Sequence, residues 1–316
     1  HEAVRALVAD IAAYVTRDPV DAQIQSFDYA TRTFSFTESQ PGVTLDQDLL
    51  YERVTAALAR WESGVTVTVD PIVTEPAVTK DELVASFGLV AAYTTETTND
   101  SNRNTNIDLA CQAINGTALM PGETFSFNQA TGQRTTEKGY KSAGAIAAGQ
   151  SIEEVGGGIC QVSSTLFNAV ARANLEIVSR SPHAWPSTYV NIGEDATVNW
   201  PNLDFQFKNN TKSPIFIITY YKNRRMSAEI WGMSLGEGVT IDLQSTIIKT
   251  IDPPSEVKYE LNTDLPYGTE KTTVKARTGY VVETEKVWYK DGQETRRELL
   301  HTSNYRAYQQ VIEYNY

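Results

Sequence analysis

The stretch that decides the fold is residues 156–169, which read GGGICQVSSTLFNA. The three glycines predict a flexible turn, and the apolar side chains that follow recur at helical spacing. Ile159, Val162 and Leu166 fall on one face of such a helix. We therefore predict a glycine loop that enters a helix running from Ile159 to about Ala173, with its apolar face packed on a sheet.

Cys160 lies off this apolar face, in the first turn of the predicted helix and on the same side as Ser163 and Ser164. The unpaired N–H groups and the helix dipole at that end stabilise a negative charge. A thiol placed there has a pKa below the free value of about 8.5, which favours the nucleophilic thiolate. Glycines without a Cβ would also let a substrate backbone come close to the sulfur.

A candidate base follows at His183, in the stretch SPHAW. A helix after Cys160 and a strand over residues 175–179 would return the chain and bring the imidazole beside the helix start. Asp195 is the predicted orienting carboxylate, and Asp204 is the alternative. The order of cysteine, histidine and aspartate resembles the arrangement in transglutaminases and papain-like cysteine peptidases.

Two other interpretations stay open for the same residues. In the first, His183 caps a turn, Cys160 packs as a small apolar residue and the glycines allow close helix packing. In the second, Cys111 and Cys160 form a disulfide, because an extracellular protein can keep one. Two cysteines are too few for a disulfide scaffold or a structural zinc site, so we predict no metal and no cofactor.

Other residues are expected to contact a ligand near the predicted nucleophile. One of them lies in PGETFSFN, residues 121–128, where Glu123 could line a cleft. The alternative for that stretch is a Pro-Gly turn that feeds a strand with Phe125 and Phe127 on one face. The predicted ligand-binding residues are Gly156, Gly157, Gly158, Gln161, Ser163, Ser164, Trp185 and Glu123.

Composition and charge exclude several classes of function. The net charge of -12 and a pI near 4.8 oppose nucleic-acid binding, which relies on clustered Lys and Arg. No apolar run approaches the ~20 residues that span a bilayer, and the first fifteen residues predict an amphipathic helix. Because the chain begins with His1, we expect a membrane anchor to precede it in the native protein.

The first 88 residues predict a small α+β unit. Helices are expected over residues 4–15 and 49–61, and strands over residues 34–37 and 65–69, the last from the alternation VTVTV. The stretch GVTLD, the helix after it and the later PAVT resemble the peptidoglycan-binding domain found before wall enzymes. A plain spacer domain is the alternative interpretation.

The tail changes character and predicts a small antiparallel sheet. Alternating segments occur at residues 239–243, 272–276 and 280–288, and Asp291-Gly292 is a strong hairpin signal. The run from ARTGYVVETEKVWYKDG to the C-terminal VIEYN resembles the five-glycine (G-five) domain, a β module of extracellular wall enzymes and adhesins. The alternative for this tail is a β spacer.

Several separate motifs in the region between residues 93 and 231 resemble the VanW family. They occur in the order NRNTNI, NG, PGETFSFN, GGGICQVSSTLFNA, GEDATV and FKNN. The resemblance implies a place in the envelope of a Gram-positive bacterium and a link to vancomycin resistance, but no particular reaction. Cys111 stands where the family pattern has a small residue such as alanine, which favours a buried thiol there.

We predict a multidomain α+β chain with three modules in a row. They are a peptidoglycan-binding α+β domain over residues 1–88, a VanW domain over 89–236 and a five-glycine-like β domain over 237–316. In the central domain, the helix from Ile159 is expected to pack on an antiparallel sheet made largely by residues 187–231.

The predicted function is that of an extracellular, cell-wall-associated protein acting on peptidoglycan or its peptide precursors. Cys160 would attack an amide carbonyl, His183 would carry the proton and Asp195 would orient the imidazole. Backbone N–H groups in residues 158–161 would stabilise the oxyanion. The alternatives are a non-catalytic protein that binds peptidoglycan in a groove and, third, an adhesin or stalk component.

Overall fold

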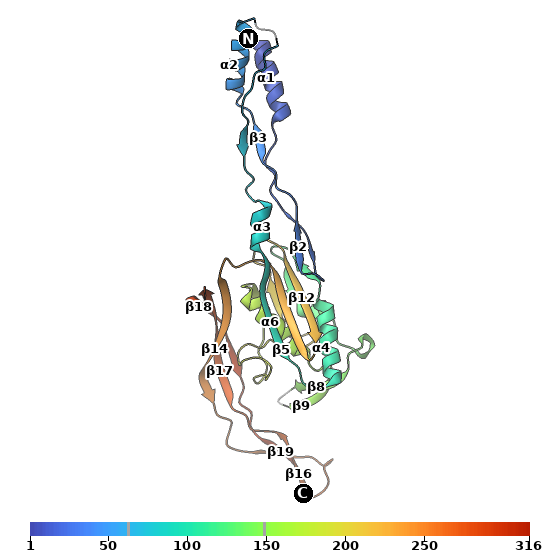
Figure 1. Ribbon diagram of the computed structural model, residues 1–316. Helices are drawn as coiled ribbons and strands as arrows, with labels where there is room; N and C mark the ends of the chain where they lie inside the picture. Colours follow the sequence, from blue (N-terminus) through green and yellow to red (C-terminus); the bar gives the residue numbers. More distant parts are fainter. Residues whose placement is uncertain (62–63, 148–149) are drawn as a thin grey trace. The chain divides into compact units, whose positions relative to one another are not determined.

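The computed structural model describes residues 1–61, 64–147 and 150–316, and the chain divides into two compact units, His1–Phe87 and Gly88–Tyr316 (Figure 1). Helices and strands alternate irregularly in the first two thirds of the chain, and strands dominate the last third. This confirms the predicted multidomain α+β class with an all-β C-terminal part. None of the helices in the described ranges is long and apolar enough to cross a membrane.

The first unit contains two helices that pack together and short strand pairs. Its elements are α1 (Glu2–Val15), β1 (Ile24–Asp28), β2 (Thr33–Phe36), β3 (Gly42–Thr44), α2 (Gln47–Ala59), β4 (Ile72–Thr74) and α3 (Lys80–Ser86). Helix α2 begins at Asp46, whose carboxylate accepts the N–H of Leu49 at 2.9 Å. Thr79 and Glu82 form a capping box at the start of α3.

The strand predicted over residues 65–69 is wrong. Those residues connect α2 to β4, and β4 pairs with β3 in the register Gly42 with Thr74. An alternating pattern predicts which face of a strand is buried, but a strand also needs a partner edge. Here β3 pairs with residues 72–74, and VTVTV has no partner strand in the described part of the chain.

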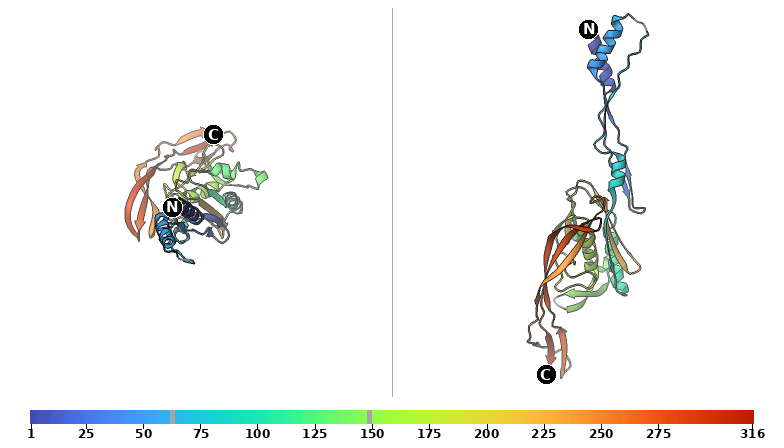
Figure 2. Two further views of the ribbon diagram at one scale, coloured as in Figure 1. Left: turned by 90° about the horizontal axis from the view of Figure 1, so that it is seen from above. Right: turned by 60° about the vertical axis from the view of Figure 1, so that its left-hand side comes forward.

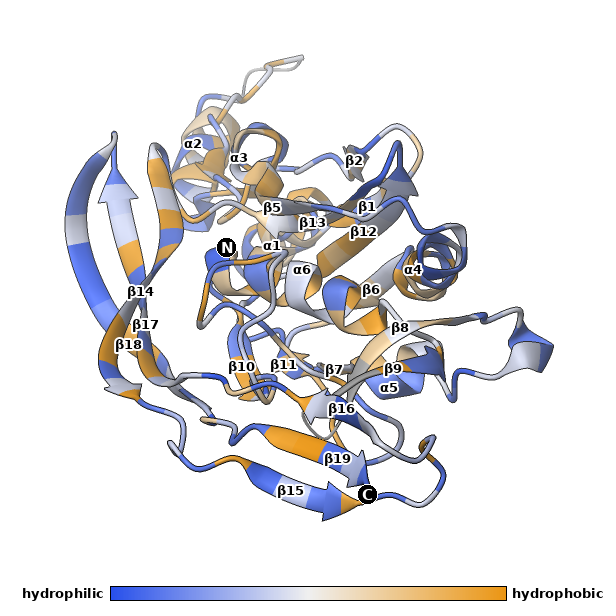
Figure 3. Ribbon diagram, turned by 90° about the horizontal axis from the view of Figure 1, so that it is seen from below, coloured by the Kyte–Doolittle hydropathy of each residue, from blue (hydrophilic) through white to orange (hydrophobic). Residues whose placement is uncertain are grey.

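The second unit is built around a four-stranded sheet in the order β5-β13-β12-β6. Its strands are β5 (Phe87–Glu96), β6 (Thr117–Leu119), β12 (Ile215–Lys222) and β13 (Arg225–Met233). Helix α4 (Ser101–Ile114) packs on β12, helix α6 (Ile159–Arg172) packs on β13, and the two helices touch. Strand β12 is largely apolar (Figure 3), and its side chains Ile215 and Ile217 join those of the helices in one core.

The predicted helix from Ile159 is therefore confirmed as α6, whereas the prediction for its sheet was only partly right. Strands β12 and β13 lie almost wholly within residues 187–231, and the other two strands come from earlier in the chain. Residues 187–205 contain no named strand. They form irregular segments instead, and residues 196–198 of these lie against the start of α6.

A second small sheet in this unit has the order β10-β11-β7, with β10 (Glu176–Ser179), β11 (Gln206–Lys208) and β7 (Thr124–Ser126). Phe125 lies on β7 and packs on Phe207 with ring centroids 5.0 Å apart. The predicted strand does not reach Phe127. That residue begins the short helix α5 (Phe127–Thr131), because the Ser126 hydroxyl caps the backbone there.

The C-terminal strands form two sheets. The long one has the order β14-β17-β18, with β14 (Val239–Ile251), β17 (Gly279–Lys290) and β18 (Gln293–Tyr305), and it curves along one side of the central elements (Figure 2). The hairpin predicted at Asp291-Gly292 is confirmed, since both residues have the positive φ of a type I′ turn.

The second C-terminal sheet contains β15 (Lys258–Leu261), β19 (Val311–Asn315) and β16 (Thr269–Val274), in that order. Strands β19 and β16 are antiparallel, whereas β15 and β19 are parallel. The small antiparallel sheet expected for the tail is therefore divided into two sheets, and one of their pairings is parallel. Alternation within a strand carries no information about the direction of its neighbour.

Candidate active site

The glycine turn before α6 is packed tightly against the chain itself. Gly158 is the N-cap and has φ +105°, a left-handed conformation that favours glycine. A Cβ on Gly157 would lie 2.4 Å from the carbonyl oxygen of Ala143, and one on Gly158 would lie 2.8 Å from Cγ of Arg103. The glycines therefore have a packing role of their own, and their predicted contact with a ligand stays a prediction.

Cys160 is the second residue of α6 and is partly buried. Its Sγ donates to the carbonyl of Val198 at 3.4 Å, in the irregular segment that crosses the helix start. Cys111 is buried in α4, and both cysteines are free. The alternative of a disulfide between them is therefore wrong, and the expectation of a buried thiol at position 111 is confirmed.

The surroundings of Cys160 favour its thiolate. Burial raises the pKa of the thiol, but a hydrogen bond to His183 and the positive charge of that ring act in the opposite direction. The charge of Arg134 adds to this effect, and the pKa of Cys160 is held below its ordinary value. Burial without such partners raises the pKa of Cys111 well above that of a free thiol.

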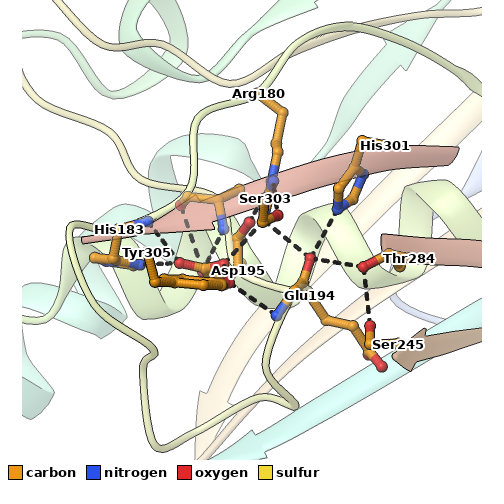
Figure 4. Close-up of polar contacts among 12 residues, drawn as sticks. Arg180, His183, Glu194, Asp195, Ser245, Thr284, His301, Ser303 and Tyr305 are labelled. Carbon is orange, nitrogen blue, oxygen red and sulfur yellow. Dashed lines mark hydrogen bonds and ion pairs between the residues drawn. The ribbon is translucent and has the colours of Figure 1, made fainter. Parts of the chain in front are cut away.

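His183 lies between the cysteine and Asp195. Its Nδ1 is 2.5 Å from Oδ2 of Asp195, and its backbone N–H donates to the same oxygen at 2.7 Å (Figure 4). Burial lowers the pKa of His183, but the hydrogen bonds and charges of Asp195 and Cys160 raise it to about 10. Since Nδ1 faces the carboxylate, Nε2 is the nitrogen left to exchange a proton.

Asp195 is the carboxylate that the structure places beside the imidazole. Its side chain is 1% exposed, and burial alone would raise its pKa. Hydrogen bonds and charges from His183 and Arg180 lower the pKa of Asp195 to about 2. Asp204, the alternative carboxylate, accepts from Asn128 N–H at 2.9 Å and from the Ser126 hydroxyl at 2.6 Å, at the start of α5.

Three polar residues of α6 that were predicted to bind a ligand are buried and already have partners. Gln161 donates to the hydroxyl of Thr95 at 2.9 Å. Ser163 donates to the carbonyl of Ala196 at 2.5 Å, and Ser164 accepts from the Ala196 N–H at 2.9 Å. The two serines hold the segment that carries Asp195 against the helix, which is a structural contribution to the site.

Trp185 and Glu123 are the other two side chains that were predicted to bind a ligand. Trp185 is buried under the guanidinium of Arg277, whose Cζ is 4.1 Å from the ring centroid, and under Tyr308. Glu123 is exposed and accepts the N–H of Met120 at 2.8 Å within the turn before β7. These contacts do not involve Cys160, His183 or Asp195, so the ligand contacts of Trp185 and Glu123 stay predictions.

The structure also brings in residues that were not among the predicted site residues. Arg134 is a basic residue whose three guanidinium nitrogens are buried without a hydrogen-bond partner among the described residues. Tyr189 has its hydroxyl 3.4 Å from Nε2 of His183. Arg180 and Tyr305 contact Asp195. No local pattern marks Tyr189, Arg180 or Tyr305, because each reaches the site through long-range packing, whereas Arg134 lies in the stretch GQRTTEKGY, whose polar residues favoured a solvated loop.

Three protein-family models match the chain. Residues 1–66 match a model described as "Putative peptidoglycan binding domain", residues 102–231 match "VanW like protein", and residues 244–315 match "G5 domain". The predicted resemblances are thus confirmed in the predicted order along the chain.

Two curated relatives and one solved structure are similar to parts of the chain. "Uncharacterized protein YoaR" of Bacillus subtilis is 44% identical over 52% of this chain and 53% of its own length. "Vancomycin B-type resistance protein VanW" of Enterococcus faecalis is 33% identical over 35% of this chain and 42% of its own length. The chain therefore spans about half the length of these relatives.

The solved structure is titled "IgA1 Protease G5 domain structure". It is 22% identical, covers 25% of this chain and 92% of its own length, and has a TM-score of 0.17.

Proposed function

Since the chain belongs to the VanW-like proteins through residues 102–231, we propose that it acts at the cell wall as a cysteine-dependent hydrolase or acyltransferase of peptidoglycan peptides. The neighbouring peptidoglycan-binding and G5 domains are those of a cell-wall-associated protein. One observation carries the chemical part of this proposal: the imidazole of His183 is shared between the thiol of Cys160 and the carboxylate of Asp195.

The proposed reaction runs through a thioester. The thiolate of Cys160 attacks an amide carbonyl carbon, and the new C–S bond replaces the C–N bond as the amine leaves with the proton from His183. Water or an acceptor amine then gives its proton to the imidazole and attacks the thioester carbon. The C–S bond breaks, and the thiolate is restored. Asp195 keeps the ring oriented and stabilises its cation throughout.

Two of the four predicted oxyanion donors already have backbone partners. We predicted donors in residues 158–161, but the N–H of Ile159 bonds to Gly156 at 3.2 Å and that of Gln161 bonds to Gly158 at 3.0 Å. The amides of Gly158 and Cys160 remain, and we assign this role to the Cys160 N–H because it lies in the first turn of α6, on the residue that carries the nucleophile. Developing negative charge there is also stabilised by the helix dipole.

Digestion of peptidoglycan fragments tests the proposal. We expect the full chain to convert muropeptides into products of changed mass, which are separated by chromatography and identified by mass spectrometry. Cys160→Ala should lower this conversion by roughly 1,000-fold or more, because the covalent step is lost. Cys111→Ala is the matched control and should leave conversion close to wild type, since its thiol is buried in α4 and burial raises its pKa.

A chain that binds peptidoglycan fragments but leaves every one unchanged, with wild type and Cys160→Ala alike, would contradict the enzyme. The non-catalytic binding protein would then account for the data. Equal conversion by wild type and Cys160→Ala would also contradict the role of the cysteine.

A further inference from the structure

The carboxylate of Asp195 is held from two sides. On one side, His183 donates to Oδ2 from its backbone and its ring. On the other side, Oδ1 accepts from the phenol of Tyr305 at 2.6 Å and from Nη2 of Arg180 at 2.9 Å (Figure 4). Tyr305 is the last residue of β18 and is 1% exposed. It lies within the segment that matches the G5 model.

Tyr305 is one of three residues of β18 that face the site. His301, Ser303 and Tyr305 alternate along the strand, so they lie on the same face of its sheet (Figure 4). Nε2 of His301 lies 2.8 Å from the carbonyl of Gly193, and the Ser303 hydroxyl accepts from Nη1 of Arg180 at 2.6 Å. Burial lowers the pKa of His301 to about 4, so near neutral pH its ring is uncharged and donates through Nε2.

Gly193 shows how closely the C-terminal strands pack on the turn before Asp195. Its φ is +93°, and a Cβ would lie 2.5 Å from Oγ1 of Thr284 and 2.9 Å from Oγ of Ser245. These residues belong to β17 and β14. The N–H of Gly193 donates to the Tyr305 hydroxyl at 2.8 Å, so one phenol bridges the turn and the carboxylate.

The segment that carries His183 also contacts the C-terminal part of the chain. The N–H of Arg306 donates to the carbonyl of Ala184, the residue after His183, at 3.1 Å. Arg277 lies over the ring of Trp185. The base and the carboxylate thus both depend on contacts with the C-terminal strands.

We propose that β14, β17 and β18 form one wall of the catalytic site and that Tyr305 is a positioning residue, which fixes Asp195 and, through it, the ring of His183. This inference rests on the proposed function and goes beyond it, because the G5-like segment becomes part of the reaction centre. The phenol can donate throughout the neutral range, since burial and the nearby carboxylate raise the pKa of Tyr305.

Tyr305→Phe in the full chain tests this assignment, because it removes the donor to Asp195 and keeps the ring. We expect the rate constant kcat for muropeptide conversion to fall by roughly 10- to 100-fold, because the ring of His183 would be less well placed to transfer the proton. The change in KM should be smaller. We also expect the acid limb of the Cys160 alkylation profile to move to higher pH, because a loosely held imidazolium stabilises the thiolate less well.

Tyr289→Phe is the matched control. It also removes a phenol hydroxyl from the long sheet, but that hydroxyl accepts from Gln244 at an exposed position. It should leave both kcat and the alkylation profile at wild-type values. Should Tyr305→Phe fail to fold, Ser303→Ala replaces it, since it releases Arg180 and should shift the same profile in the same direction by a smaller amount.

A Tyr305→Phe protein with the alkylation profile and kcat of Tyr289→Phe would overturn the assignment. Alkylation needs no substrate, so it separates this inference from the proposed function. If wild type converts no muropeptide, the proposed function fails, and the profile alone still decides whether the C-terminal strands position the triad.

Discussion

Asp195 holds a charge in a place where burial alone would remove it. His183, Arg180 and Tyr305 donate to its carboxylate, and its pKa of about 2 is below the ordinary value near 3.9. A carboxylate with a lowered pKa stabilises the folded state above its unfolded pKa. This contribution is therefore fully present above about pH 4 and is lost as the pH falls through 2.

Asp195→Asn should remove this contribution. We expect the variant to lose roughly 3 kcal/mol of the free energy of unfolding at pH 6, because the buried charges of Arg180 and His183 would then lack a negative partner. The difference from wild type should shrink as the pH falls from 4 to 2, as measured by urea unfolding across that range. Asp242→Asn is the control, since that side chain is 59% exposed. A difference that stays constant down to pH 2 would contradict the account.

Residue identity at the triad was predictable because cysteine, histidine and aspartate each carry distinctive chemistry. The structure brings Cys160, His183 and Asp195 together as the sequence predicted. Their supporting residues were not predictable, because Arg180 and Tyr305 are ordinary residue types that reach Asp195 from distant parts of the chain. The serines of α6 were assigned to the ligand because their buried partner, Ala196, could not be foreseen.

At the scale of elements, the glycine turn and α6 form the part of the site that depends most on close packing. Gly157→Ala should lower the free energy of unfolding by roughly 1–3 kcal/mol, because its Cβ would meet the backbone of Ala143 at 2.4 Å. Gly144→Ala is the matched control, since a Cβ there has no neighbour within 4 Å. Thermal unfolding of both variants measures the difference in stability. Equal melting temperatures for Gly157→Ala and Gly144→Ala would contradict the packing role of Gly157.

Helix α6 was predictable because its apolar residues repeat at helical spacing and a glycine turn precedes it. The strand over residues 65–69 and the extension of a strand to Phe127 were wrong for a common reason. Pattern alone fixes a possible element, whereas its partner edge or a capping side chain such as Ser126 decides where the element forms and ends.

At the scale of the molecule, the order of the family matches was predictable, but the contacts made by the C-terminal strands were not. Hydrophobic alternation predicted β14, β17 and the hairpin to β18. The alternation did not indicate which loop of the chain the buried faces of these strands would cover. Those faces cover the turn at Gly193 and reach Asp195, so the division into modules does not mark the limits of the site.

The central claim is that Cys160 is an ionised, reachable nucleophile paired with His183. Alkylation of the full chain by iodoacetamide against pH, with the two cysteine peptides resolved by mass spectrometry, measures it directly. We predict that Cys160 reacts with an apparent pKa below that of a free thiol, and that His183→Ala raises this pKa because burial then acts without the ring's opposing charge. An apparent pKa equal to that of a free thiol and unchanged in His183→Ala would contradict the account.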